Sequence, residues 1–183
     1  FKDFASKQLE LHFKFLQNSG TGLCYHGWDG AQRNHLSGCY WGRANAWIMA
    51  AAPEILENVG EFSNKDTVIK CYRALAEALR KHQTGEGGIR TLVDDETAYI
   101  ETSATAGYAY GILRAVKMGL LDADYTSAAE LAREYVLTQI KEDGSVVGVS
   151  GGTPIMKDAQ AYKDIPTSTT LYGQGLTLLM LCE

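Results

Sequence analysis

The residues with the clearest chemistry lie in one stretch of the chain, residues 24–47, which holds all three tryptophans. Two of its residues, Arg43 and Trp47, are four positions apart and would share a face of a helix. A guanidinium binds a carboxylate through two parallel hydrogen bonds, and an indole offers a flat apolar surface. The pair therefore suits a flat anionic ring such as a uronic acid. The alternative, given equal weight on residue chemistry, is that Trp47 is a core residue and Arg43 pairs with a nearby acid.

Asp29 is the candidate acid of this stretch, because it closely follows His26 and Trp28. A carboxyl group beside an indole can have a raised pKa, which a general acid needs at neutral pH. Asp29 and Gly30 also form a common turn dipeptide, and the turn is the favoured interpretation. Asp29 is therefore the candidate catalytic residue within the chain, with a purely structural turn as the competing hypothesis.

A zinc site is a third hypothesis for the same stretch. Two cysteines and two histidines could supply four ligands: Cys24, His26, His35 and Cys39. Their spacing is not one of the common zinc patterns, and cysteines often act as small buried hydrophobic residues. We therefore expect no metal and no cofactor.

A second acidic cluster, Asp94, Asp95, Glu96 and Glu101, precedes an apolar segment. Carboxylates are favoured at helix N-termini, where amide groups lack partners. We expect Asp94 and Asp95 to cap the next helix, and the role of Glu101 is left open. The loop over residues 150–170 has the glycines and polar residues of a cleft wall, without an evident catalytic group.

The elements that must position these residues are helices of two kinds. Apolar side chains recur at helical spacing, with charged residues on the other face, over 3–17, 64–82 and 125–140. Other segments are apolar nearly all round and rich in small residues: 42–52, 103–121 and 171–182. A helix that is apolar on every side must be covered on every side, so the second kind is predicted to be buried.

The two kinds alternate, and the amphipathic helices begin about 60 residues apart, which suggests a repeated helical hairpin. Glycine-bearing loops lead from each amphipathic helix to the next buried one, and long loops gathered at one end commonly carry function. We therefore predict an all-α toroid of inner and outer helices, of which about three hairpins lie in this chain. Only short extended pieces are expected, over 22–27 and 144–150. Because large exposed apolar surfaces drive association, we expect a larger barrel or a second chain to close the arc.

Composition excludes several classes of protein. The 183 residues include 17 Lys and Arg against 22 Asp and Glu, giving a net charge of −5. An acidic chain without a basic run is not expected to bind nucleic acid, and no apolar stretch approaches the roughly 20 residues that span a membrane. The scattered cysteines favour a cytoplasmic location. The chain begins without Met and without a signal-peptide pattern, so we expect a piece of a longer protein.

Four strings carry a resemblance to a known family: TGLCYHGWD, NHLSGCYWGRANAW, ETSATAGYAYGILRAVKMGLL and LYGQGLTLLMLCE. In this order they resemble glycoside hydrolase family 105, the unsaturated rhamnogalacturonyl and related unsaturated glucuronyl hydrolases. The resemblance implies an (α/α)6 barrel catalytic domain, with residues 1–183 as its C-terminal part and the N-terminal half absent.

The resemblance also implies a reaction and the residues for it. Family members hydrate the 4,5 double bond of an unsaturated uronic acid at the non-reducing end of pectin-derived oligosaccharides. An Asp protonates C4, water adds at C5, and the hemiketal then breaks down, without a metal. By position, His26 matches the histidine of H-G-W, and Arg43 would bind the uronate carboxylate. Trp47 would stack on or border the ring, and Trp41 would line the same pocket.

The family's catalytic aspartate precedes H-G-W in a segment resembling V-D-x-x-F-M. Nothing in residues 1–25 matches that segment, and Asp3 lies in the wrong helical context. We therefore expect the intact protein to be an enzyme and the 183 residues alone to be inactive. They could still bind a small oligosaccharide, and they could self-associate through the open edge of the barrel. The alternative is a non-catalytic carbohydrate-binding or scaffold piece with the same fold.

Overall fold

A computed structural model describes all 183 residues. The helices are α1 (Lys2–Leu16), α2 (Gly42–Val59), α3 (Lys65–His82), α4 (Thr102–Lys117), α5 (Thr126–Thr138), α6 (Ala159–Lys163) and α7 (Leu171–Cys182), with a short 3-10 turn at Ala123–Tyr125. Two short strands, β1 (Val149–Ser150) and β2 (Thr167–Ser168), pair antiparallel. The prediction of an all-α architecture is confirmed.

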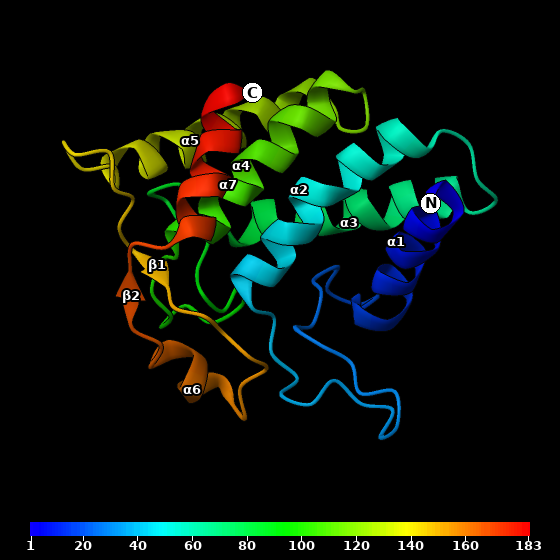
Figure 1. The fold of residues 1–183 in the computed structure, drawn as a ribbon, viewed down its shortest axis with the longest axis horizontal. Coiled ribbons are helices and arrows are strands. Elements are labelled where there is room, and N and C mark those ends of the chain that lie inside the picture. Colours follow the sequence, from blue (N-terminus) through cyan, green and yellow to red (C-terminus); the bar gives the residue numbers. More distant parts are fainter.

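The long helices form two rows, as the alternation in the sequence predicts (Figure 1). Helices α2, α4 and α7 are the inner row, in which α4 packs against both α2 and α7. Helices α1, α3 and α5 lie on the outer side and carry the more polar faces. Helix α4 is the most deeply buried of the inner row, because the chain covers it from both sides. The inner row is an open arc that ends at α2 and at α7.

Helix α2 runs seven residues beyond the segment expected from the sequence, and it continues through Pro53. A proline inside a helix has no N–H for the carbonyl one turn earlier. That carbonyl belongs to Met49, and the buried Tyr72 hydroxyl of α3 lies 3.2 Å from its oxygen. The same hydroxyl lies nearer, at 2.8 Å, to the Gly111 oxygen of α4, so Tyr72 joins α2, α3 and α4 beside the proline.

Small residues let α2 and α4 approach closely. A Cβ atom built on Gly111 of α4 would lie 2.5 Å from the Met49 oxygen of α2. No real side chain fits at that distance, so the position requires glycine. The close contact of the two helices confirms that small residues in these apolar segments serve packing.

The long loops gather at one end of the helices, below them in Figure 1. The extended piece expected over 144–150 is β1 at its C-terminal end, whereas 22–27 forms only an isolated bridge from Cys24 to Gln17. The sequence did not predict α6, which lies in the loop between β1 and β2. No helix is both long enough and apolar enough to cross a membrane.

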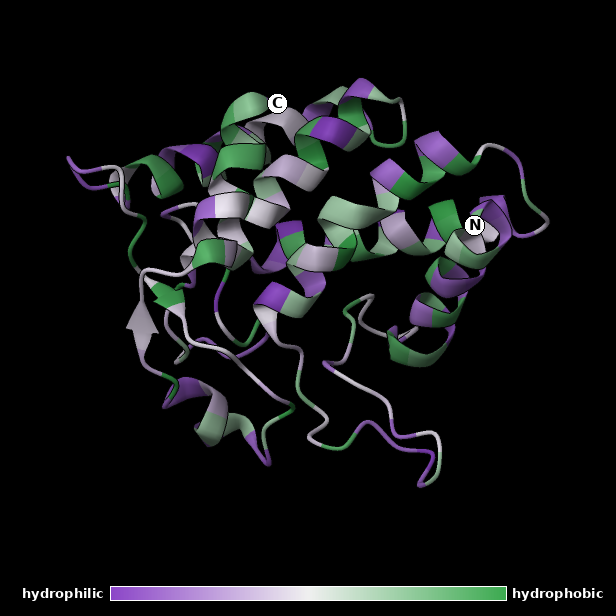
Figure 2. Ribbon diagram, viewed as in Figure 1, coloured by the Kyte–Doolittle hydropathy of each residue, from purple (hydrophilic) through white to green (hydrophobic).

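The α7 end of the arc exposes apolar side chains. Leu171 is 91% exposed, and three further leucines of α7 are at least partly exposed: Leu178, Leu179 and Leu181. Figure 2 shows the C-terminal end of this helix in the hydrophobic colour. These side chains lie along the open edge that, on the expectation from the sequence, a larger barrel or a second chain closes.

Candidate active site

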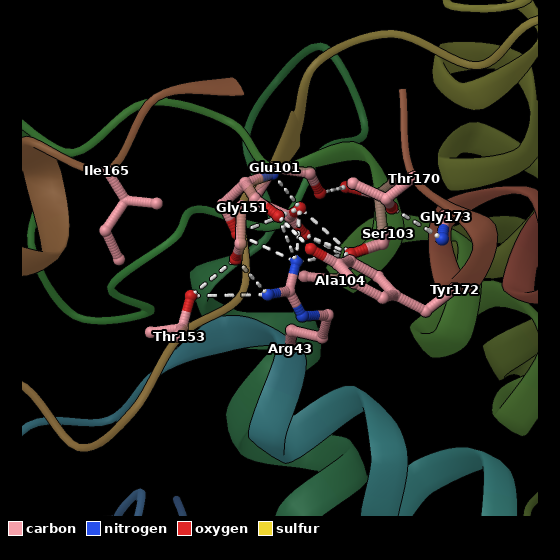
Figure 3. Close-up of polar contacts among 12 residues, drawn as sticks. Arg43, Glu101, Ser103, Ala104, Gly151, Thr153, Ile165, Thr170, Tyr172 and Gly173 are labelled. Carbon is pink, nitrogen blue, oxygen red and sulfur yellow. Dashed lines mark hydrogen bonds and ion pairs between the residues drawn. The ribbon is translucent and has the colours of Figure 1, made fainter. Parts of the chain in front are cut away.

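Arg43 is the centre of the polar network at the loop end of the inner helices (Figure 3). It lies in the first turn of α2, and its side chain is only 3% exposed. Its Nη1 donates to the carbonyl and hydroxyl oxygens of Ser150, both at 2.8 Å, and to Glu101 Oε1 at 3.3 Å. Its Nη2 donates to the Gly151 oxygen at 2.8 Å and to Thr153 Oγ1 at 3.3 Å. The guanidinium thus joins α2 to α4 and to the loop that contains β1.

Glu101 is the buried counter-charge of Arg43 and also the N-cap of α4. Its carboxylate accepts hydrogen bonds from the backbone N–H groups of Ala104 at 2.6 Å and Ser150 at 2.7 Å. The Ser103 hydroxyl donates to the same carboxylate at 2.8 Å. Burial raises the pKa of Glu101, and the charge of Arg43 opposes that rise. This answers the question that the sequence left open about Glu101.

The expectation that Asp94 and Asp95 cap the following helix is wrong, because Glu101 takes that position. Asp95 instead accepts hydrogen bonds from the hydroxyl and the N–H of Thr97, and it pairs with Lys163 of α6 at 2.9 Å. These contacts, the Thr97 hydroxyl foremost, lower the pKa of Asp95 to about 2. Asp95 therefore holds α6 against the loop before α4.

Two aromatic rings pack on the Arg43 guanidinium. Its Cζ lies 4.4 Å from the ring centroid of Trp41 and 4.3 Å from that of Tyr172. Both distances are within the range of cation–π attraction. The Tyr172 hydroxyl also donates to the Ser150 oxygen at 2.8 Å, so the ring is tied to the same network.

His26 lies beside this cluster, half-buried on the loop before α2. Its ring centroid is 4.3 Å from that of Trp41, and its Nδ1 is 2.6 Å from the hydroxyl oxygen of Tyr162 on α6. Burial, with a smaller contribution from the charge of Arg43, lowers the pKa of His26 to about 4. The imidazole is therefore neutral at physiological pH.

The structure does not bring Trp47 into a shared pocket with Arg43, contrary to the sequence expectation. Trp47 is 43% exposed and lines a hollow of about 180 Å³ between α1 and α2, together with Gln8 and His12. Arg43 is not among the residues that line this hollow. The reason is that the Arg43 guanidinium hydrogen-bonds to acceptors at the start of α4 and in the β1 loop, and therefore does not point into this hollow. A spacing of four residues placed both side chains on one helix but could not indicate which neighbour each would meet.

Asp29 forms a turn. Its Oδ1 accepts hydrogen bonds from the N–H groups of Ala31 at 2.8 Å and Gln32 at 3.0 Å. No hydrogen bond or ion pair links it to His26 or Arg43. The geometry therefore favours the turn and gives no support to Asp29 as a catalytic acid.

The four residues of the zinc hypothesis do not come together, and no group of three His, Cys, Asp or Glu side chains could hold a metal ion. Cys24 is buried in the core. His35 stacks on Tyr25 at 3.9 Å and its Nε2 lies 2.7 Å from the Phe15 oxygen. Cys39 points to the Ser37 carbonyl. The zinc hypothesis for these residues is therefore wrong.

Sequence reasoning missed the partners that hold this site together, namely Ser150, Tyr162 and Tyr172. Tyr172 lies in one of the four strings quoted for the family resemblance, so a signal for it existed. Ser150 and Tyr162 lie in the loop that showed no evident catalytic group, and their types are too common to stand out.

Comparisons with known proteins agree with the fold and the family. The model of Glycosyl Hydrolase Family 88 matches residues 1–183. The chain is 35% identical over 179 residues to the unsaturated rhamnogalacturonyl hydrolase YesR of Bacillus subtilis, covering 97% of this chain and 50% of that protein.

Two crystal structures described as possible members of family GH105 are each 34% identical to the chain. The structure from Klebsiella pneumoniae has a TM-score of 0.94, and the match covers 98% of this chain and 48% of the Klebsiella chain. The structure from Salmonella enterica has a TM-score of 0.92, and the match covers 96% of this chain and 47% of the Salmonella chain. The chain thus spans about half the length of YesR and of both crystal structures. These matches confirm the resemblance to family 105 that the sequence motifs indicated, and the chain belongs to glycosyl hydrolase family 88.

Proposed function

We propose that this protein hydrolyses unsaturated uronyl oligosaccharides by hydrating the 4,5 double bond of the non-reducing-end uronic acid. The observation that carries the proposal is the cluster at the loop end of the inner helices, where a buried guanidinium lies between two aromatic rings beside a neutral histidine. A positive charge next to aromatic rings suits an anionic sugar ring. The identity to YesR, named an unsaturated rhamnogalacturonyl hydrolase, supports a pectin-derived substrate.

In the proposed binding mode, the uronate carboxylate takes over the Nη2 contacts of Arg43 that Gly151 and Thr153 now make. The Thr153 contact is long, at 3.3 Å, and both residues lie in a partly exposed loop. The Nη1 contacts with Glu101 and Ser150 stay in place and keep the guanidinium oriented. Trp41 lies under the site and His26 borders it.

We propose that the acid that protonates C4 comes from outside residues 1–183. Asp29 is held in a turn, and the carboxylate closest to Arg43 in the network, Glu101, is fully buried and used for capping. Neither of these two carboxylates is both exposed at the cluster and free of a structural role. Residues 1–183 alone are therefore expected to bind the sugar but not to turn it over.

The absorbance of the C4=C5 bond gives a direct assay. The intact protein should remove this absorbance from an unsaturated rhamnogalacturonan disaccharide and release rhamnose, and it should leave the saturated disaccharide unchanged. Residues 1–183 alone should bind the unsaturated disaccharide, measured by calorimetry, without turnover. Lack of turnover by the intact protein would contradict the proposed activity.

Binding without turnover by the intact protein would favour the second candidate, a non-catalytic carbohydrate-binding protein. The observation that favours this candidate is that the carboxylate paired with Arg43, Glu101, is buried and caps α4. Arg43→Gln should abolish binding under either candidate, provided that circular dichroism shows the variant to be folded.

We also propose that further helices cover the two ends of the inner row and complete a toroid. At one end, α7 exposes Leu178 and Leu181, and at the other, Trp47 lines the hollow beside α1. Expressed alone, residues 1–183 should self-associate through these surfaces, and light scattering should show less association for Leu178→Glu combined with Leu181→Glu. A monomer at all concentrations would contradict this proposal.

A further inference from the structure

Helix α6 brings a buried hydroxyl group to the imidazole of His26. Tyr162 is fully buried on this short helix, 136 residues away from His26 in sequence. Its hydroxyl oxygen lies 2.6 Å from His26 Nδ1, 3.3 Å from Ser37 Oγ and 3.2 Å from the backbone nitrogen of Met156. Each of these groups competes for the one proton or the lone pairs of the phenol.

The donors and acceptors can be assigned by counting protons. The Met156 N–H is a donor only, so it uses a lone pair of the Tyr162 oxygen. The phenol has a single proton, which can go to His26 or to Ser37. The contact with His26 is shorter by 0.7 Å (3.3 − 2.6), a length typical of a strong hydrogen bond. Burial raises the pKa of Tyr162, so the hydroxyl stays protonated and remains a donor.

We propose that Tyr162 is a positioning residue that donates its proton to Nδ1 of His26 and thereby keeps the imidazole proton on Nε2. A neutral imidazole carries one proton, so an acceptor role for Nδ1 makes Nε2–H a donor. This nitrogen is then suited to an oxygen acceptor such as a hydroxyl group or ring oxygen of a sugar. The sugar as acceptor rests on the proposed function, whereas the tautomer does not.

The surroundings of His26 fit a fixed neutral ring. The Trp41 ring packs against the imidazole at 4.3 Å, which restricts its rotation. Burial and the nearby Arg43 lower the pKa of His26 to about 4, so a second ring proton is absent at neutral pH. The opposite tautomer would need Nδ1–H to donate to the Tyr162 oxygen and the phenol proton to use the longer contact with Ser37.

Nuclear magnetic resonance of the intact protein with ring-15N histidine tests the tautomer without any substrate. The His26 signals are assigned by their loss in His26→Gln. At pH 7 the wild type should show a protonated Nε2 and an unprotonated Nδ1. A protonated Nδ1 in the wild type would overturn the proposal.

Variants test whether Tyr162 is the cause. Tyr162→Phe removes only the hydroxyl, and the His26 signals should then shift to a mixture of the two tautomers. Tyr99→Phe is the matched control, because it removes a half-buried hydroxyl that bonds to the Ile165 oxygen next to α6. Tyr99→Phe and Ser37→Ala should both keep the wild-type pattern. A folded Tyr162→Phe with unchanged tautomer, or a switch in Ser37→Ala, would contradict the proposal.

Discussion

Replacement of Glu101 by alanine should destabilise the protein strongly, because the carboxylate joins three segments from a fully buried position. The change leaves the guanidinium of Arg43 buried without its counter-charge, and it removes the N-cap of α4. Removing one partner of a buried ion pair costs about 3–5 kcal/mol, and loss of an N-cap about 0.5–2 kcal/mol. Both costs arise from loss of the same carboxylate, so they are not independent. We therefore expect the free energy of unfolding to fall by about 3–5 kcal/mol in total, and not by the sum of the two costs.

Urea unfolding followed by circular dichroism measures this loss. With a slope of about 2 kcal/mol per molar urea, typical of small proteins, the midpoint should fall by roughly 2 M. The matched control is Glu61→Ala, which breaks the exposed pair with Lys65 and should leave the midpoint unchanged. If residues 1–183 associate under the assay conditions, the comparison is made in the intact protein.

A double substitution tests whether the ion pair itself is responsible. Glu101→Leu combined with Arg43→Met replaces both charges by apolar groups, which can cost far less than removal of one charge alone. The double variant should therefore be more stable than Glu101→Ala. If Glu101→Ala lowers the free energy of unfolding by less than about 1 kcal/mol, the reasoning about the buried pair is refuted. It is also refuted if the effects of the two single substitutions on the free energy of unfolding add up to the effect of the double substitution.

Three further predictions concern packing, pH and the excluded acid. Gly111→Ala should lower the free energy of unfolding by about 1–3 kcal/mol in thermal unfolding, because the new Cβ would meet the backbone of α2. Gly175→Ala should raise the free energy of unfolding by about 0.5–1 kcal/mol, because Gly175 in α7 has open space around it. The folded-state pKa of His26, about 4, lies below its unfolded value, so its contribution to stability is present above pH of about 6.5 and is lost as the pH falls toward 4. The unfolding free energy of His26→Asn should accordingly fall less steeply over that pH range, and an equal slope would contradict the lowered pKa. Asp29→Asn keeps the oxygen that accepts the hydrogen bonds of the turn, and it should retain the wild-type kcat in the absorbance assay. A fall in kcat of about two orders of magnitude would instead identify Asp29 as the acid.

The helices could be predicted from the sequence because their signals are local. Periodic apolar residues located α3 to within a residue at its start, and continuous apolar segments identified the inner row. The end of α2 could not be predicted, since a proline commonly ends a helix and the packing of α2 against α3 and α4 cannot be seen in the local sequence. Local patterns do not contain a partner that arrives through tertiary packing.

The site could be predicted only in part, for the same reason. Trp41, His26 and Arg43 stood out because unusual residues lie close together in the sequence. The partners of Arg43 lie 58 residues away at Glu101 and 107 residues away at Ser150, so no spacing rule joins them. The sequence could not show that Trp47 and Arg43 meet different neighbours, because a shared helix face does not determine which way a long arginine side chain turns.

The most direct test of the central claim is the fate of C4 when the intact protein acts on the unsaturated disaccharide in heavy water. Hydration by an enzyme-held acid predicts that deuterium appears at C4 in a single configuration and that loss of the double-bond absorbance does not lag behind release of the second sugar. Release of the second sugar while the double bond persists, or deuterium on both faces of C4 from the first turnovers, would contradict the account.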